Sequence, residues 1–116
     1  MITAILEAML LFATFLIHES FHYIVARLFG YNPKFVFSSY FSPTIIYTNR
    51  GEDLKNLCIS LAGPLGTVII GMLVPDIDLF NLFKIVCFLH LICLTPITAD
   101  GQVILLSILN IVRGKV

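Results

Sequence analysis

Residues 57–74 read LCISLAGPLGTVIIGMLV, an apolar run without a charged side chain. Because a membrane-spanning helix needs about 20 mostly apolar residues, this run predicts such a helix. Two further apolar segments, residues 2–29 and 79–112, lie on either side of it. The last is too long for one straight crossing of a hydrocarbon layer of about 30 Å, so we expect it to break near Pro96–Gly101. The predicted fold class is an all-α membrane protein with three transmembrane helices.

The composition favours the same class. The 116 residues are 59% hydrophobic and 12% charged, whereas a soluble domain has roughly 45–50% apolar and about 25% charged residues. Residues 1–116 are therefore expected to form a single domain within a lipid bilayer. Seven basic residues offset seven acidic ones, so the formal net charge is zero. Because no basic surface is available to neutralise phosphates, a nucleic-acid partner is not expected.

The first connection carries a β-hairpin signal over about residues 34–48. Aromatic residues alternate with other residues at Phe35 and Phe37, and Ile45 and Tyr47 alternate in the same way after Ser42-Pro43. Period-2 runs separated by such a dipeptide predict two strands joined by a turn. Two roles are open for this hairpin. It can lie at the membrane interface with its aromatic rings among the headgroups, or it can offer a strand edge to an extended peptide.

The orientation in the membrane follows from basic residues in the short connections, which prefer the cytoplasmic side. The basic residues beside the first connection are Arg27, Lys34, Arg50 and Lys55. The second connection instead carries Asp76 and Asp78, and the chain ends with Arg113 and Lys115. A multi-pass protein with its N-terminus outside and its C-terminus in the cytoplasm is therefore predicted. This topology puts residues 18–22 and Asp100 at a similar depth, toward the cytoplasmic face.

Residues 18–22 read HESFH, an H-E-x-x-H motif. Residues four apart share one face of a helix, so His18 and His22 can hold one zinc ion. Glu19 can accept a proton from water at that metal. The alternative is a structural cluster of hydrogen-bonded polar groups. A charged side chain at the centre of a membrane helix costs roughly 2.5–3.5 kcal/mol, a cost that a divalent metal offsets. We therefore favour metal binding.

A catalytic zinc site has three protein ligands and one open position for water, so one Zn²⁺ per chain requires a third ligand. Asp100 is the leading candidate because it lies in the interior of the last apolar segment, where an unwound stretch after Pro96 would turn its carboxylate inward. Glu52 is the alternative, although it lies among charged residues of the first connection. His90 lies nearly three helical turns before Asp100, so we expect it to form a hydrogen bond between helices rather than to share the metal.

Three motifs in their order along the chain resemble the site-2 protease family of intramembrane zinc metalloproteases. They are HESFH at 18–22, AGP at 62–64 and PITADG at 96–101. The family has a core of three membrane helices, so the resemblance covers nearly the whole chain. It implies that His18, His22 and Asp100 are the zinc ligands and that Glu19 is the catalytic acid and base.

The chain departs from the family pattern in its second and third motifs. Family members usually carry asparagine three residues after the proline of the Ala-Gly-Pro motif, where this chain has Thr67. They also carry asparagine before the proline of the third motif, where this chain reads Cys93-Leu94-Thr95-Pro96. The resemblance implies that these amides help to hold the substrate backbone. The departures therefore bear on substrate handling more than on zinc binding.

The predicted function is an intramembrane zinc endopeptidase that cleaves a membrane-spanning or membrane-associated substrate near the cytoplasmic face. One alternative is a non-catalytic metal-binding membrane protein that binds a peptide or a partner. Another is a metal-ion carrier, in which histidine and aspartate line an ion path. Three helices can hardly shield a polar site from lipid on all sides. Self-association or docking to a partner membrane protein is therefore also expected.

Overall fold

The computed structural model describes residues 1–38 and 42–114. The elements are α1 (Ile2–Leu28), β1 (Lys34–Ser38), β2 (Ser42–Ile46), α2 (Asp53–Leu73), the 3-10 helix η2 (Asp78–Phe80), α3 (Asn81–Leu89), the 3-10 helix η3 (His90–Leu94) and α4 (Ala99–Val112). Positions 39–41 of the predicted hairpin, and Lys115 of the predicted basic C-terminus, lie outside the described residues. The described chain is therefore mostly helical with one small sheet, as predicted.

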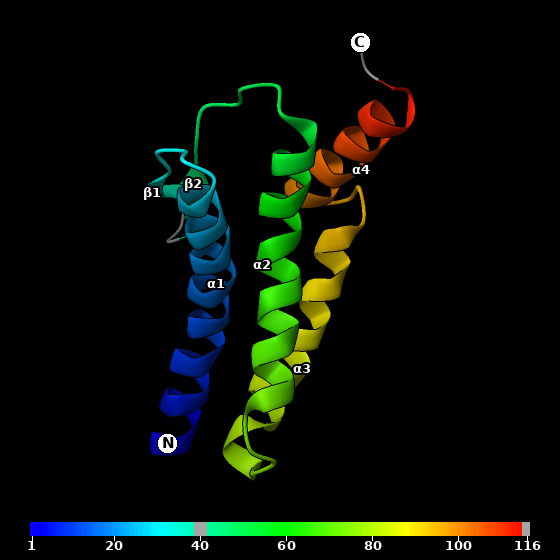
Figure 1. The fold of residues 1–116 in the computed structure, drawn as a ribbon. Helices are drawn as coiled ribbons and strands as arrows, with labels where there is room; N and C mark the ends of the chain where they lie inside the picture. Colours follow the sequence, from blue (N-terminus) through cyan, green and yellow to red (C-terminus); the bar gives the residue numbers. More distant parts are fainter. Residues whose placement is uncertain (39–41, 115–116) are drawn as a thin grey trace.

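The helices form an elongated bundle of 57 × 25 × 24 Å. Helices α1, α2 and α3 run side by side, and α4 leaves the bundle at an angle beyond the end of η3 (Figure 1). Helix α2 is central, since it contacts α1, α3, η3 and α4. The first and last helices are therefore both held against α2.

Small residues allow α2 to approach its neighbours closely. A Cβ added at Gly66 would overlap the ring of Phe21 on α1, and one added at Gly71 would lie 2.6 Å from Cβ of Cys87 on α3. Helices that meet in an apolar environment commonly use small residues in this way. Helix α2 begins at Asp53, a few residues before the predicted start at Leu57. The added residues form its polar end.

The third apolar segment is broken, as predicted. Its two parts, Asp78–Leu94 and Ala99–Val112, are bent by 41°. Residues 95–98 between the two parts are not helical, which agrees with the predicted unwound stretch after Pro96, but Asp100 itself lies in the first turn of α4. Thr98 is the N-cap, and its Oγ1 accepts a hydrogen bond from the Gly101 N–H at 3.1 Å. Such a cap satisfies a free N–H, and an acid in the first turn also interacts favourably with the helix dipole.

The hairpin pairs its strands antiparallel, with Phe35 opposite Ile45 and Phe37 opposite Pro43. The predicted turn at Ser42-Pro43 was wrong, because both residues belong to β2. A proline lacks the N–H that a central strand needs, but a strand with a free edge tolerates it. In this sheet of two strands, each strand has such an edge.

Large apolar side chains cover much of the molecular surface. In the most apolar window of α1, only 11% of the residues are buried inside the structure. Among the described residues, α1 and α2 are long and apolar enough to cross a membrane. The bent pair of η2–η3 and α4 passes the same test when it is counted as one span. The cluster of buried apolar residues is small and consists of Ala26, Tyr31 and Ile59.

Candidate metal centre

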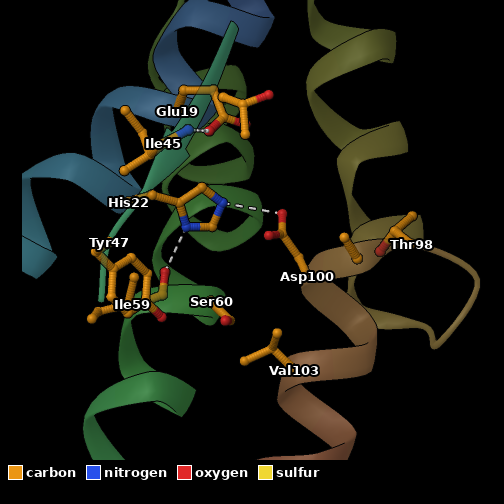
Figure 2. A pocket seen from close by; sticks show the side chains of 11 residues that line it. Glu19, His22, Ile45, Tyr47, Ile59, Ser60, Thr98, Asp100 and Val103 are labelled. Carbon is orange, nitrogen blue, oxygen red and sulfur yellow. Dashed lines mark hydrogen bonds and ion pairs between the residues drawn. The ribbon is translucent and has the colours of Figure 1, made fainter. Parts of the chain in front are cut away.

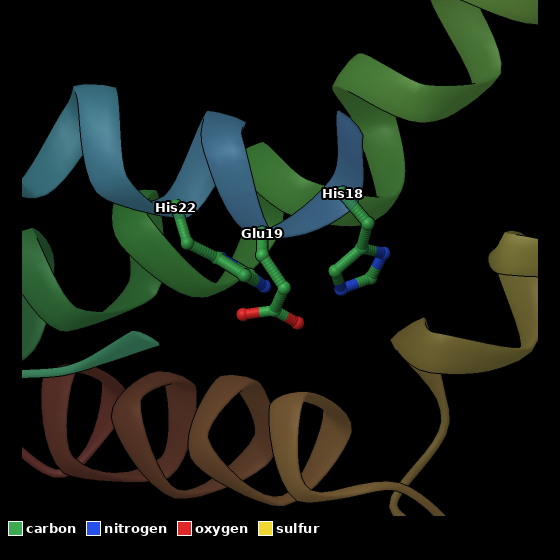
Figure 3. A group of neighbouring side chains, drawn as sticks. All are labelled: His18, Glu19 and His22. Carbon is green, nitrogen blue, oxygen red and sulfur yellow. The ribbon is translucent and has the colours of Figure 1, made fainter. Parts of the chain in front are cut away.

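His18 and His22 lie one turn apart on the face of α1 that meets α2 and α4. Each residue is only 5% exposed, and their ring centroids are 4.7 Å apart. Figure 3 shows both imidazoles on the same side of the helix, with Glu19 between them. The spacing of four residues produces this arrangement, because 3.6 residues complete a helical turn.

The structure brings Asp100 to both histidines. Its Oδ2 lies 2.8 Å from Nε2 of His18 and 3.1 Å from Nε2 of His22, across sequence separations of 82 and 78 residues. The Asp100 side chain is 29% exposed, so it is partly open to the cavity beside it. Three predicted metal ligands from two helices therefore meet at one point.

Glu52, the alternative third ligand, takes part in a different group of side chains. Lys55 Nζ lies 2.7 Å from its Oε2, and the Tyr31 hydroxyl donates to its Oε1 at 3.2 Å. The hydrogen bond from Lys55 lowers the pKa of the Glu52 carboxyl, because it stabilises the charged form. Glu52 therefore contacts Lys55 and Tyr31 at the polar end of α2 rather than the two histidines.

The hydrogen bond of the His22 imidazole fits a metal ligand. His22 Nδ1 donates to the Ile59 carbonyl oxygen at 2.6 Å, which leaves the lone pair of Nε2 facing Asp100. A backbone carbonyl commonly orients a metal-binding histidine in this way. A lone pair that faces a carboxylate oxygen requires a cation between them, either a proton or a metal. Two imidazoles and one carboxylate are also a donor set that zinc accepts.

Because Gly63 has no side chain, the two imidazoles can occupy the space beside it. A Cβ at this position would overlap the His22 ring and would lie 2.8 Å from His18 Nε2. The glycine of the Ala-Gly-Pro motif therefore has a steric role at the candidate metal centre. The sequence singled out this glycine as part of the Ala-Gly-Pro motif but did not show what it contacts.

Glu19 lies at the edge of a cavity of about 340 Å³. The cavity is lined by residues that include Glu19, His22, Tyr47, Ser60 and Asp100. Figure 2 shows how α1, β2, α2 and α4 all contribute to it. The Ile45 N–H donates to Glu19 Oε2 at 3.0 Å, so β2 is attached to α1 beside the histidines. Two carboxylates, the His22 imidazole and the β2 strand thus face one small volume.

His90 lies closer to the candidate metal centre than the sequence indicated. Its ring centroid is 5.0 Å from that of His18, and its Nδ1 donates to the Val86 carbonyl oxygen at 2.8 Å, one turn back along the chain. His90 was expected to form a hydrogen bond to another helix. Among the described residues, it instead contacts His18 on α1 through its ring. Separation along a straight helix was the wrong measure, because the break after η3 brings both His90 and Asp100 to His18.

Donor atoms that could hold a metal form two groups among the residues that the structure describes. His18, Glu19 and His22 form one group, and His18, Cys93 and Asp100 form the other, with the donor atoms of each group within 4.8 Å of one another. Cys93 was not among the ligands predicted from the sequence. Its place near the aspartate depends on the bend between η3 and α4.

Compared with protein-family models, with curated proteins and with solved structures, the chain has no significant match.

Proposed function

We propose that this protein is an intramembrane zinc endopeptidase that resembles the site-2 protease family. The observation that carries the proposal is the meeting of His18, His22 and Asp100 beside Glu19. The H-E-x-x-H motif predicts two ligands and a base from local sequence. The aspartate comes from a distant helix, and its oxygen lies within 3.1 Å of both imidazoles. That is the donor set of a catalytic rather than a closed structural zinc site.

The proposal includes three membrane spans, with the bent pair as the third. Its support is the largely unburied apolar surface of α1, α2 and the bent pair. In water this surface would be unfavourable, whereas hydrocarbon accepts it. The basic first connection and the acidic second connection favour an N-terminus outside and a C-terminus in the cytoplasm. The metal centre then lies toward the cytoplasmic side, where water can reach it.

In the proposed mechanism, His18, His22 and Asp100 would hold the zinc ion. When bound, zinc supplies Lewis-acid catalysis by polarising the scissile carbonyl and by acidifying water. Glu19 accepts the proton of the attacking water and returns it to the leaving amine. Because a carboxylate has two oxygens, the hydrogen bond from the Ile45 N–H to Oε2 leaves Oε1 to accept that proton. The backbone of β2 lies beside the base, where an extended substrate segment could pair with it.

A membrane-protein or peptide substrate fits this arrangement, because a peptide bond inside an intact helix is protected by internal hydrogen bonds. The substrate must therefore unwind before cleavage. The chain also exposes most of α1, which supports self-association or docking to a partner membrane protein. Cross-linking in native membranes tests this part of the proposal, and recovery of only single chains contradicts it.

Elemental analysis of the full chain purified in detergent tests the metal site. We expect about one zinc per chain. Asp100→Ala should lower zinc affinity by roughly 100-fold or more, because loss of a ligand costs more than the 10- to 100-fold typical of losing a group that only orients one. The matched control is Glu52→Ala, which removes an acid that contacts Lys55 rather than the histidines and should keep full zinc occupancy. Equal loss of zinc in both variants would contradict the proposed ligand set.

A cleavage assay then tests the base. Fluorescently labelled single-span peptides in liposomes serve as the substrate library. Glu19→Gln should lower the cleavage rate by roughly 100-fold or more while zinc stays bound, because general acid-base catalysis contributes about 10²–10⁴-fold. Cleavage at the normal rate by this variant would refute the role of Glu19.

The hydrogen bond from Ile45 to Glu19 favours one second candidate function. A strand that occupies the carboxylate is also compatible with a non-catalytic metalloprotein that holds a peptide or partner at this edge. Such a protein would bind zinc through the same ligands. It would cleave no peptide of the library in either the unaltered or the Glu19→Gln form, which separates the two functions.

A further inference from the structure

Cys93 lies where a metal at the candidate centre could reach it. The donor atoms of Cys93, His18 and Asp100 are all within 4.8 Å of one another. Ligands bound to one tetrahedral zinc at about 2.0–2.3 Å lie about 3.3–3.6 Å apart. A shift of roughly 1 Å in these side chains would therefore convert the group into a coordinating set.

The two donor groups share His18. This residue is only 5% exposed, and its Nε2 lies 2.8 Å from Asp100 Oδ2. A metal bound to that nitrogen would therefore have donor atoms of both groups around it.

The bend between η3 and α4 fixes Cys93 relative to Asp100. Thr98 Oγ1 donates to the Cys93 carbonyl oxygen at 3.1 Å and accepts from the Gly101 N–H at 3.1 Å. One hydroxyl thus joins the residue before the break to the first turn after it. A Cβ at Gly101 would also overlap the Thr95 carbonyl, so the two segments are in close contact. The thiol and the carboxylate are therefore held on one rigid corner.

We infer that Cys93 is a fourth protein ligand of the metal and that its thiolate closes the coordination sphere in the resting protein. The inference rests on the proposed zinc site. On binding, the S–H bond breaks, the proton passes to water, and the sulfur lone pair forms the bond to the metal. Four protein ligands leave no position for water, as in structural zinc sites. Release of Cys93 opens that position, so the thiol regulates access to the same centre.

Cobalt substitution tests the inference without an activity measurement. The full chain in detergent is loaded with Co²⁺, and metal content and absorption are recorded together. A cobalt-bound thiolate produces a charge-transfer band in the near ultraviolet that nitrogen and oxygen ligands do not produce. We expect this band in the unaltered protein and its loss in Cys93→Ser. Cys58→Ser and Cys87→Ser are the matched controls, and both should keep it.

The outcomes separate this inference from the proposed function. Cobalt bound at about one per chain without the band overturns the role of Cys93 and leaves the other ligands intact. Failure of the protein to bind cobalt or zinc overturns the metal site, and the inference with it. Retention of the band in Cys93→Ser would show that another cysteine is the ligand and would also overturn the inference.

A second measurement leaves Cys93 unaltered. In a variant that carries both Cys58→Ser and Cys87→Ser, Cys93 is the remaining thiol. Zinc should slow its alkylation by a maleimide roughly tenfold, because a metal-bound sulfur is a poor nucleophile. A chelator should restore the original rate. An alkylation rate that zinc does not change would contradict the inference even if Cys93→Ser failed to fold.

Discussion

At the scale of single residues, the packing of Gly63 is as informative as the ligands themselves. The two histidines share a helical face because of their spacing, but they can meet Asp100 only because α2 presents no side chain in the intervening space. The glycine is therefore a condition for the metal centre, although it has no donor atom. The need for glycine at position 63 is therefore steric: a larger residue would collide with the imidazoles.

Gly63→Ala should lower zinc affinity by roughly 10- to 100-fold, the range typical of disturbed ligand orientation. The added methyl group must displace the imidazoles from Asp100. Competition with a chelator of known affinity measures the change. The matched control is Gly66→Ala, whose methyl group meets Phe21 instead of a histidine. It should destabilise the bundle without a comparable loss of zinc affinity, and equal losses in the two variants would contradict this assignment.

At the scale of elements, the corner between η3 and α4 depends on a single threonine. Thr98 caps α4 and at the same time contacts the Cys93 carbonyl. The helix therefore begins one residue before Asp100 rather than after it. A carboxylate in the first turn of a capped helix is better fixed than one in an unwound segment.

Thr98→Ala should lower the free energy of unfolding by about 1 kcal/mol, as loss of an N-cap typically does. Unfolding of the detergent-solubilised protein, followed by circular dichroism, measures this change. Thr98→Ser keeps the hydroxyl and should stay within about 0.5 kcal/mol of the unaltered protein. If the alanine and serine variants were equally stable, the hydroxyl would have no capping role.

The hairpin is attached to α1 through the Glu19 carboxylate. Because the Ile45 N–H donates to that carboxylate, its exchange with solvent should be slow in the unaltered protein. Glu19→Ala removes the acceptor and should accelerate exchange of this amide on the order of tenfold. Glu19→Gln keeps an oxygen acceptor and should preserve most of the protection. Hydrogen exchange followed by NMR or mass spectrometry decides between these outcomes, and fast exchange in the unaltered protein would contradict the contact.

At the scale of the whole molecule, the proposed topology can be tested by chemical labelling. In a background with all three cysteines changed to serine, Asp78→Cys and Thr48→Cys each place one thiol at an exposed connection. With the proposed orientation, an impermeant maleimide added to intact cells should label only Asp78→Cys. Thr48→Cys should react only after permeabilisation. The reverse pattern would invert the topology, and labelling of both in intact cells would contradict a membrane-spanning arrangement.

Much of the secondary structure was determined by local sequence. Apolar runs of sufficient length predicted the helices of residues 2–28 and 53–73 to within a few residues, because an apolar surface without interruption favours a helix whose backbone is satisfied internally. Pro96 predicted the break in the last segment. The hairpin was also predicted, but its turn was not, since a strand with a free edge tolerates Pro43.

The histidine pair and the adjacent glutamate were also determined by the sequence, because a spacing of four places two side chains on one helical face whatever the rest of the chain does. The sequence also indicated Asp100 as the leading third ligand, but the place of Asp100, His90 and Cys93 relative to the histidine pair was decided only by the tertiary structure. Residues on both sides of the 41° bend lie near His18: His90 and Cys93 in η3, and Asp100 in the first turn of α4. Gly63 leaves room for that approach. Such contacts depend on how helices cross, and no local pattern encodes a crossing between residues 82 positions apart.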